Sequence, residues 1–259
     1  IKDVFALGLF FLSILSKPMA VTLPALLLLF DWFVNSRISR KDILNKLPFC
    51  LPAALVAADI LWTVMLNKDG TIPSGLPVYI NMLAAFYGLV FYPLKFLWPS
   101  GLSCLYPYPD FSTAIPARVL AAPALAAVWA AAAFWSLRRT KILLFGSAFF
   151  LITVLPVLQW VQSGHCIAAD RYFYIPGLGL GYMLSALLVF AFERLKPLPR
   201  KLLAALLAAA FIALFCSAYN RSFLWRDSAL IWADALKKYP DSQVALANSA
   251  QALYSMGLY

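Results

Sequence analysis

Charged residues are scarce in this chain of 259 residues. Only 12% of the residues are Asp, Glu, Lys or Arg, whereas 63% are hydrophobic. Because soluble globular domains carry about 25% charged and about 45–50% apolar residues, this composition excludes an ordinary water-soluble domain. It equally excludes a disordered chain, and four cysteines are too few for a small secreted module held together by disulfides. The class that remains is a polytopic helical membrane protein, whose apolar segments must pair their backbone polar groups internally.

Long apolar runs separated by short polar segments make up most of the sequence. A transmembrane helix needs about 20 predominantly apolar residues, and seven runs approach or reach that length. These predicted spans are residues 4–16, 19–34, 48–66, 118–136, 142–161, 176–192 and 202–218. We therefore expect an all-α fold, in which about seven transmembrane helices form a bundle.

Three short segments between these runs are strongly basic. Eleven of the 21 Lys and Arg residues lie in residues 35–46, 136–141 and 193–201. Since cytoplasmic loops are enriched in Lys and Arg, all three segments are predicted to face the cytoplasm. The loops 67–117 and 162–175, and the chain from residue 219 onward, then lie outside.

A further apolar run, residues 79–98, differs from the seven predicted spans. If it crossed the bilayer, residues 136–141 would fall outside, against their three positive charges. The run is also rich in Tyr and Trp, which favour the headgroup level of a membrane. We therefore expect 79–98 to be one interfacial or re-entrant helix beside the seven spans.

The first residue of the chain lies in an apolar run, and the last lies in a helical pattern. Ile1 opens directly into an apolar run, without the basic region and cleavage site of a signal peptide. Tyr259 ends a helical pattern. We therefore expect the chain to be a piece of a longer protein.

Two isolated charges adjoin or interrupt predicted spans. Lys17 lies between spans 4–16 and 19–34, at the outer surface in the predicted orientation. Its amine can hold a lipid phosphate, or it can simply mark the helix end by extending into the headgroup region. Asp59 lies within the run 48–66. An acid at that depth is costly and indicates a functional intramembrane site, or a neutral carboxyl hydrogen-bonded between helices.

The densest polar cluster extends into the predicted outer loop 162–175. Arg171 is the one basic residue in this loop and is flanked by Asp170 and Tyr172. A guanidinium can bind a phosphate through two parallel hydrogen bonds; alternatively, Asp170 and Arg171 form a local pair that caps the next helix. His165 has no second histidine or carboxylate at ligand spacing, so no metal ligand set is predicted.

The cysteines suggest one covalent link. Cys104 and Cys166 both fall in predicted outer loops and could form a disulfide in an oxidising compartment. Cys50 and Cys216 lie at helix ends and behave as small apolar residues.

The composition becomes amphipathic from residue 219. Residues 225–238, and a second stretch from Ser242 to Gly257, predict two helices separated by a Pro-Asp turn. This pattern is similar to the tetratricopeptide repeat, a helix-turn-helix with small and aromatic residues at set offsets. We therefore expect two domains, the end of a transmembrane domain (1–218) and the start of an α-solenoid (219–259), with more repeats beyond it. A single amphipathic hairpin on the membrane is the alternative.

Three local sequences accompany this pairing of a membrane bundle with repeats. The first is Ser-Lys-Pro-Met-Ala-Val-Thr-Leu-Pro at 16–24, which leads to Leu-Phe-Asp at 29–31. The second is Lys-Phe-Leu-Trp-Pro at 95–99, followed by Leu102 and Tyr106-Pro107, and the third is Ala-Asp-Arg-Tyr-Phe-Tyr-Ile-Pro at 169–176 with Gly179. Together they resemble the bacterial relatives of the transmembrane and tetratricopeptide-repeat O-mannosyltransferases, a branch of the GT-C glycosyltransferases. The resemblance covers nearly the whole chain. Phe173 and Gly177 depart from the Thr and Ser of the family pattern.

The resemblance implies an inverting transferase that moves a sugar from a polyprenyl- or dolichyl-phosphate donor to an acceptor hydroxyl, such as a protein Ser or Thr, on the outer face. By motif position it implies that Lys17 and Arg171 bind the lipid phosphate, with Asp170 orienting Arg171 and Tyr172 near the sugar. The family's general base lies between its first two helices, before the position of Ile1, so no catalytic residue is assigned in this chain. The cofactor is left open: a divalent metal is compatible with the family, but no ligand set is visible.

The expected location is the bacterial inner membrane, as a multi-pass protein with its repeats on the extracytoplasmic side. The implied partners are a lipid-linked sugar, the bilayer, and a protein acceptor or assembly partner held by the repeats, and no nucleic acid. A competing hypothesis is a non-enzymatic membrane anchor whose repeats recruit envelope or secretion machinery. A transporter is disfavoured because intramembrane charges are few and no inverted repeat is visible.

Overall fold

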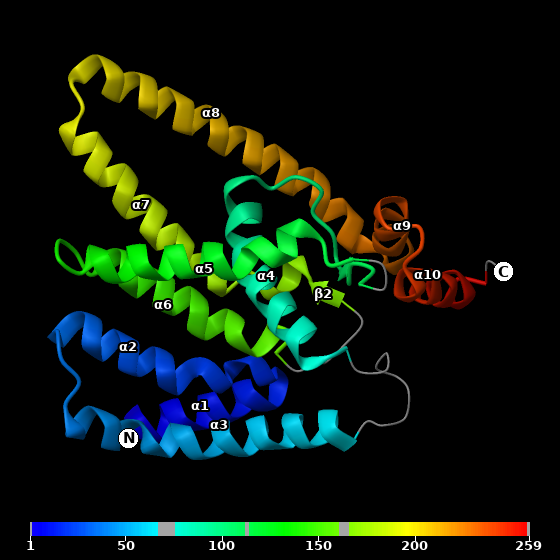
Figure 1. Cartoon of the computed structure of the whole chain (residues 1–259), viewed down its shortest axis with the longest axis horizontal. Coiled ribbons are helices and arrows are strands. Elements are labelled where there is room, and N and C mark those ends of the chain that lie inside the picture. Colours follow the sequence, from blue (N-terminus) through cyan, green and yellow to red (C-terminus); the bar gives the residue numbers. More distant parts are fainter. Residues whose placement is uncertain (1, 67–75, 112–113, 161–165, 258–259) are drawn as a thin grey trace.

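The computed structural model describes residues 2–66, 76–111, 114–160 and 166–257. Helices account for most of this part of the chain, and its two strands are short (Figure 1). The predicted predominance of helix is therefore confirmed. The helices are α1 (Lys2–Ser16), α2 (Leu23–Asn35), α3 (Arg40–Leu66), α4 (Val78–Leu97), α5 (Ala117–Ser136), α6 (Ile142–Val154), α7 (Pro176–Arg194), α8 (Pro197–Ser222), α9 (Ser228–Lys238) and α10 (Gln243–Ser255).

Six helical segments in the described ranges are long and apolar enough to cross a membrane, which is compatible with a multi-pass membrane protein. They are Pro18–Asn35, Arg40–Thr63, Val78–Leu97, Ala117–Ser136, Pro176–Arg194 and Pro197–Arg226. Two predicted spans form shorter apolar helices: the run 4–16 gives Val4–Ser16, and the run 142–161 gives Ile142–Val157. In contrast, 79–98 forms α4, whose 20 residues have spanning length.

Helix α3 begins at Arg40, well before the predicted span 48–66, because a capping box starts it inside the basic segment. The Ser39 backbone N–H donates to the Asp42 carboxylate at 2.8 Å, and the Asp42 N–H donates to Ser39 Oγ at 3.2 Å. This reciprocal pairing satisfies two N–H groups that a helix N-terminus otherwise leaves unpaired. The predicted span is thus the later part of a longer helix.

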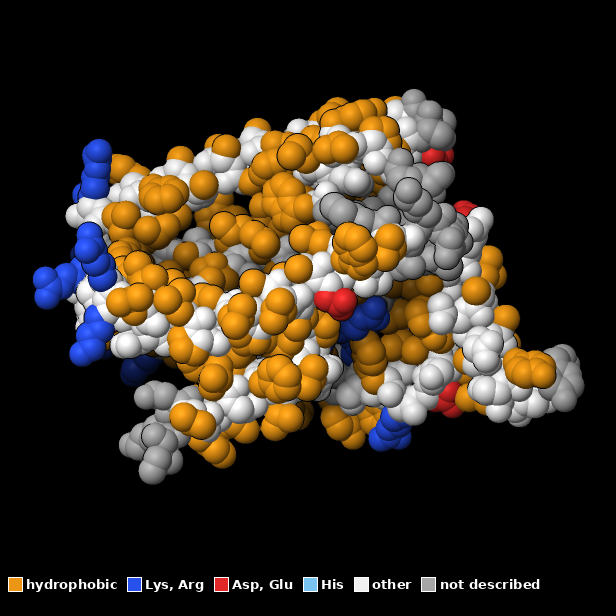
Figure 2. All heavy atoms as spheres, turned by 90° about the horizontal axis from the view of Figure 1, so that it is seen from below, with side chains coloured by type: hydrophobic (Ala, Val, Ile, Leu, Met, Phe, Trp, Pro, Cys, Tyr) orange, Lys and Arg blue, Asp and Glu red, His pale blue; other side chains and the backbone are white. Residues whose placement is uncertain are grey.

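The helical bundle has two distinct ends. The α2–α3, α5–α6 and α7–α8 turns lie together at one end, at the left of Figure 1. Figure 2 shows Lys and Arg side chains gathered at this end, whereas the flank between the ends is mostly hydrophobic. Two of the turns also touch, since Lys141 Nζ donates to Ser36 Oγ. We call this the basic end; the α1–α2 junction, the loops before α5 and α7, and the tail lie at the opposite end (Figure 1).

Helix α4 runs across the direction of α3, α5 and α6 rather than beside them (Figure 1). Helix α3 ends and α5 begins at the opposite end (Figure 1), and the number of membrane crossings between them stays a prediction. About 33% of the most apolar stretch of α4 is buried, compared with 17% or less of that in the other candidate spans. The buried residues of α4, among them Ala85, Gly88 and Tyr92, lie on one face of the helix. Helix α4 thus packs one face against the protein, and its expected interfacial or re-entrant placement stays a prediction.

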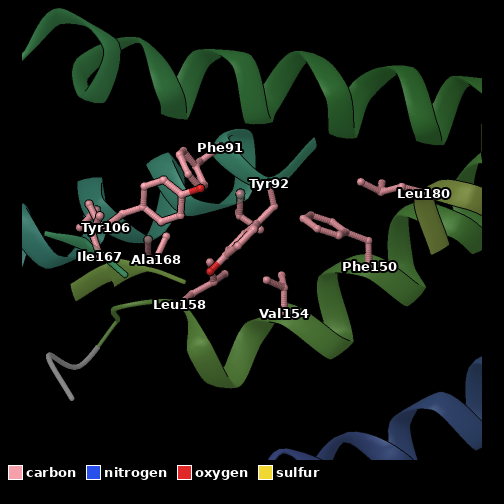
Figure 3. Packing of buried hydrophobic residues seen from close by; sticks show 12 residues of the cluster. Phe91, Tyr92, Tyr106, Phe150, Val154, Leu158, Ile167, Ala168 and Leu180 are labelled. Carbon is pink, nitrogen blue, oxygen red and sulfur yellow. The ribbon is translucent and has the colours of Figure 1, made fainter. Parts of the chain in front are cut away.

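The main hydrophobic core forms where α4 meets α6, α7 and the two strands. Tyr92 of α4 lies at its centre, with Phe91 and Tyr106 on one side and Phe150 on the other (Figure 3). The Tyr92 ring also stacks on Phe173, with ring centroids 5.7 Å apart and planes 5° from parallel. Since aromatic rings supply large buried areas, this core holds the loop before α7 firmly against the helices.

Helices α6 and α7 approach closely at two glycines. A Cβ on Gly146 would lie 2.7 Å from the Gly179 carbonyl oxygen, and a Cβ on Gly179 would lie 2.6 Å from the Gly146 carbonyl oxygen. Small residues of this kind let the backbones of membrane helices pack directly together. The contact fixes the first turns of α7 and so the loop that precedes them.

The tail is a helical hairpin that follows α8. Helix α8 continues to Ser222, past the predicted domain boundary at 219, and a 3₁₀ turn, η4 (Phe223–Arg226), leads into α9. Asp227 caps α9 by accepting from the Ala229 N–H at 2.8 Å, and Ser242 caps α10 by accepting from the Ala245 N–H at 3.3 Å. The two predicted helices are thus present, as one hairpin.

Candidate functional site

Two loops that are distant in the sequence meet at the opposite end of the bundle. Strand β1 (Tyr106–Pro107) pairs antiparallel with β2 (Cys166–Ala168), so that Tyr106 faces Ala168. Helix α4 joins the same contact, because the Ala169 N–H donates to the Tyr92 hydroxyl at 3.3 Å. Phe96 and Phe173 pack against the same core, with ring centroids 5.9 Å apart. The segments 95–99 and 169–176, recognised separately in the sequence, therefore meet there.

Asp170 is bound on both carboxylate oxygens. The Tyr106 hydroxyl donates to Oδ1 at 2.7 Å, and Arg221 Nη2 donates to Oδ2 at 2.9 Å. Burial raises the pKa of Asp170 above the ordinary carboxyl value, and the hydrogen bond from Tyr106 and the charge of Arg221 offset only part of that effect. The predicted pairing of Asp170 with its neighbour Arg171 is not found; Asp170 pairs with the last turn of α8.

The ion pair continues into the tail. Arg221 Nη1 lies 3.8 Å from Asp234 of α9, and Lys238 Nζ lies 2.6 Å from the same carboxylate. Lys238 also donates to the Leu102 carbonyl oxygen at 2.6 Å, in the loop before β1. One network of charged groups therefore joins the loop before α7, the last turn of α8 and helix α9. It holds the tail against the loops.

Arg171 and Tyr172 lie beside this network in a short 3₁₀ turn, η3 (Asp170–Tyr172). The Arg171 guanidinium sits 5.0 Å from the centre of the Tyr172 ring and donates to its hydroxyl at 3.3 Å. Among the described residues, no carboxylate lies within ion-pair distance of Arg171. Its positive charge is thus held in place by an aromatic ring and stays available to an anion.

Arg171 lines a pocket of about 200 Å³. The pocket lies between the tail and the two loops that precede β1 and α7, which we call the membrane-side loops. The other lining residues come from β1's loop, η4 and α9: Cys104, Trp225, Asp227, Ser228, Ile231 and Trp232. The floor is apolar, because Cys104 and Ile231 belong to a buried cluster shared by the loop and α9. The wall combines one cation, one carboxylate, one hydroxyl and two indole rings.

The two loop cysteines are free thiols rather than the predicted disulfide. Cys104 is buried and Cys166 packs against the same cluster. Burial raises the pKa of both thiols. The strand pairing and the charge network therefore join these loops without a covalent link.

Lys17 and Asp59 are not part of this arrangement. Lys17 is exposed between α1 and a 3₁₀ turn, η1 (Pro18–Thr22), at the same end of the bundle as Arg171 (Figure 1). Asp59 is exposed on α3. Neither side chain makes an ion pair or hydrogen bond to any residue that the structure describes. Lys17 thus lies in the α1–α2 junction, and Asp59 has no partner among the described residues.

The described ranges hold no group of three or more His, Cys, Asp or Glu side chains that could bind a metal ion. His165 lies outside the described residues. The sequence did not mark Tyr106, Arg221, Trp225 or Trp232 as site residues. Tyr106 belongs to the second of the three local sequences that carry the family resemblance, and the two tryptophans are apolar positions of the predicted helix 225–238. Nothing local indicated Arg221 as a partner of Asp170.

Neither the protein-family models nor the curated proteins and solved structures compared with this chain give a match.

Proposed function

We propose that the chain is part of an integral membrane glycosyltransferase, which moves a sugar from a polyprenyl- or dolichyl-phosphate donor to an acceptor hydroxyl on the extracytoplasmic face. The observation that carries the proposal is Arg171, a cation without a carboxylate partner in the described part of the chain, held by Tyr172 at the rim of a pocket. A guanidinium in this situation can accept the charge that develops on a departing lipid phosphate.

The arrangement of the bundle supports a lipid substrate. The basic end, which the charge distribution favours for the cytoplasm, is opposite to the end that carries Lys17, Arg171 and the tail (Figure 1). Between the two ends, an apolar groove of about 390 Å³ opens between α2, α6 and α7; it is lined by Phe30, Phe33, Phe145, Phe149, Leu178, Gly179 and Tyr182. Such a groove suits an isoprenoid chain, with its phosphate directed to the end that bears Arg171.

In this proposal Arg171 and Lys17 bind the phosphate and Tyr172 orients the guanidinium. Asp170 holds the loop through Tyr106 and Arg221, so it is a positioning residue. Neither Asp170 nor Asp59 is assigned as the general base. The tail is proposed to extend into tetratricopeptide repeats that receive a protein acceptor, in a bacterial inner membrane.

The test uses the complete protein in membrane vesicles supplied with a radiolabelled polyprenyl-phosphate sugar. We expect Arg171→Ala to lower kcat/KM for transfer by about 100-fold, since losing one donor to a developing oxyanion has an effect of that order. Arg171→Lys should recover part of the rate, because the amine keeps the charge but not the paired hydrogen bonds. Lys17→Ala should raise the KM for the lipid-linked sugar more than it lowers the kcat for transfer.

Arg226→Ala is the matched control, because Arg226 lies at the same end but stacks on Phe223 outside the pocket. Its transfer rate should equal that of the unaltered protein. Unchanged transfer in both Arg171→Ala and Lys17→Ala would remove the phosphate site. A protein that transfers no sugar but still recruits envelope proteins through its tail would support the competing scaffold.

A further inference from the structure

The pocket beside Arg171 is built by two parts of the chain. Cys104 and Arg171 come from the membrane-side loops, whereas Trp225, Asp227 and Trp232 come from η4 and α9. The pocket thus exists only while the tail is docked. Docking is secured by the Arg221–Asp170 ion pair and by the Lys238 bond to the Leu102 carbonyl.

The size of the pocket limits its ligand. Sites for drug-sized molecules enclose about 300–1,000 Å³, whereas this one encloses about 200 Å³. A single ring therefore fills this open pocket, and a larger ligand would extend beyond it.

The lining limits the chemistry further. Trp225 is 46% exposed and lines the pocket, so part of its surface can contact a ligand there. One Asp227 oxygen caps α9 through the Ala229 N–H, which leaves the other carboxylate oxygen to accept a hydrogen bond, and the exposed Ser228 hydroxyl can donate or accept. A pyranose ring offers the complementary surfaces, namely an apolar C–H face for an indole and a rim of hydroxyls for Asp227 and Ser228.

We infer that this pocket binds the pyranose ring of a hexose whose anomeric phosphate lies against Arg171. The ring packs on Trp225 and Trp232, and the hydroxyls bond to Asp227 and Ser228. The inference rests on the proposed function, because the phosphate on Arg171 is that of the lipid donor, and it adds that the tail supplies the sugar-recognising residues. Sugar selection and tail docking then occur at one place.

The test measures binding rather than transfer. The full chain in detergent micelles is titrated with three soluble probes: mannose 1-phosphate, glucose 1-phosphate and galactose 1-phosphate. Dissociation constants and saturation-transfer NMR of the ring protons are recorded, with inorganic phosphate as the comparison probe. We expect at least one hexose 1-phosphate to bind about tenfold or more tightly than inorganic phosphate, with saturation transferred to its ring C–H protons.

The variants separate the ring contacts from the fold. Trp225→Ala should weaken the hexose 1-phosphate about tenfold, a change equal to about 1.4 kcal/mol, and leave inorganic phosphate unchanged. Trp232→Phe keeps an aromatic ring in the buried cluster that it shares with Ile231, so it should weaken the hexose 1-phosphate, but less than Trp225→Ala does. Leu230→Ala is the matched control, because Leu230 is 50% exposed on α9 and does not line the pocket.

Three results would overturn the inference: no probe binds at millimolar concentration, inorganic phosphate binds as tightly as every hexose 1-phosphate, or Trp225→Ala leaves the dissociation constants unchanged. The two proposals fail separately. If transfer depends on Arg171 but Trp225→Ala does not weaken hexose 1-phosphate binding, only this inference is lost. If Trp225→Ala does weaken that binding but the protein transfers no sugar, only the proposed activity is lost.

Discussion

The Asp170 carboxylate, in the loop before α7, accepts a hydrogen bond of 2.9 Å from Arg221, in the last turn of α8. Their side chains are only about one-fifth exposed, at 20% and 19% respectively. Removing one member of a partly buried pair leaves the other charge poorly solvated. The pair therefore ties the tail to the membrane-side loop that carries Arg171.

Arg221→Met should loosen the tail. We expect a loss of about 1–3 kcal/mol in the docking of α9, less than for a fully buried pair because both groups keep some solvent contact. Hydrogen exchange of the α9 amides should become faster in the variant, while exchange in α5 and α6 stays the same.

Arg226→Met is the control for this prediction, because Arg226 contacts the Phe223 ring and joins no described ion pair. The double variant Asp170→Asn with Arg221→Met should lose less than the sum of the single variants, since the two residues act on each other. Additive losses would contradict the coupling.

Gly179→Ala should destabilise the bundle by about 1–3 kcal/mol, because its methyl group would meet the Gly146 carbonyl oxygen at 2.6 Å. Thermal unfolding in detergent measures the effect. Gly181→Ala on the same helix has no atom within 4 Å of the added Cβ and should be neutral or slightly stabilising. Equal melting temperatures for the two variants would mean that α6 and α7 do not approach at these glycines.

Cys104 should react slowly with N-ethylmaleimide, because burial raises the pKa of its thiol and the thiolate is the reacting form. In a protein with Cys104 as its single cysteine, the rate at pH 7.5 should be at least about tenfold below that of a cysteine placed at the exposed Ser255. Above about pH 9 the rate at Ser255→Cys should level off, while that of Cys104 keeps rising with pH.

Unfolding the protein in detergent should remove the difference between the two thiols. Equal reaction rates of Cys104 and Ser255→Cys in the folded protein would contradict the burial of the Cys104 thiol. Oxidative cross-linking of Cys104 to Cys166 without unfolding would contradict it as well.

The basic end and the tail should label from opposite sides of the membrane. A membrane-impermeant maleimide should reach Arg139→Cys, in the α5–α6 turn, only when the cytoplasmic face is exposed. It should reach Ser255→Cys, in α10, only from the other face. Labelling of both positions from one side would contradict the orientation and, with it, the placement of Arg171 on the donor side.

The hydropathy pattern predicted correctly those helices whose ends coincide with the ends of an apolar run. Spans 118–136 and 176–192 match α5 and α7 within two residues at each end. It missed the start of α3, because the Ser39–Asp42 capping box is polar and extends the helix into a basic segment. It also gave 142–161 too great a length, since Pro156 and a 3₁₀ turn, η2 (Leu155–Val157), end the regular helix.

The candidate site could be predicted only in part. Asp170, Arg171 and Tyr172 stood out as a polar cluster, and the expectation that Lys17 joins them at a phosphate stays a prediction. Their partners could not be read from the sequence, because Tyr106 and Arg221 lie 64 and 51 residues from Asp170. Adjacency in the chain suggested an Asp170–Arg171 pair, but the 3₁₀ turn separates the two side chains, and tertiary contacts determine which group each of them meets.

Helix α8 has 26 residues, none of them buried. At 1.5 Å per residue it is about 39 Å long, more than the hydrocarbon thickness of about 30 Å. Its charged ends, Arg200, Lys201 and Arg221, extend past the apolar run 202–218, so a bilayer that α8 crosses holds the helix by its headgroups at both ends. We expect a thinner membrane to tilt α8 and to shift Arg221 sideways along the surface. Lipid thickness would then act on the hairpin attached to this helix.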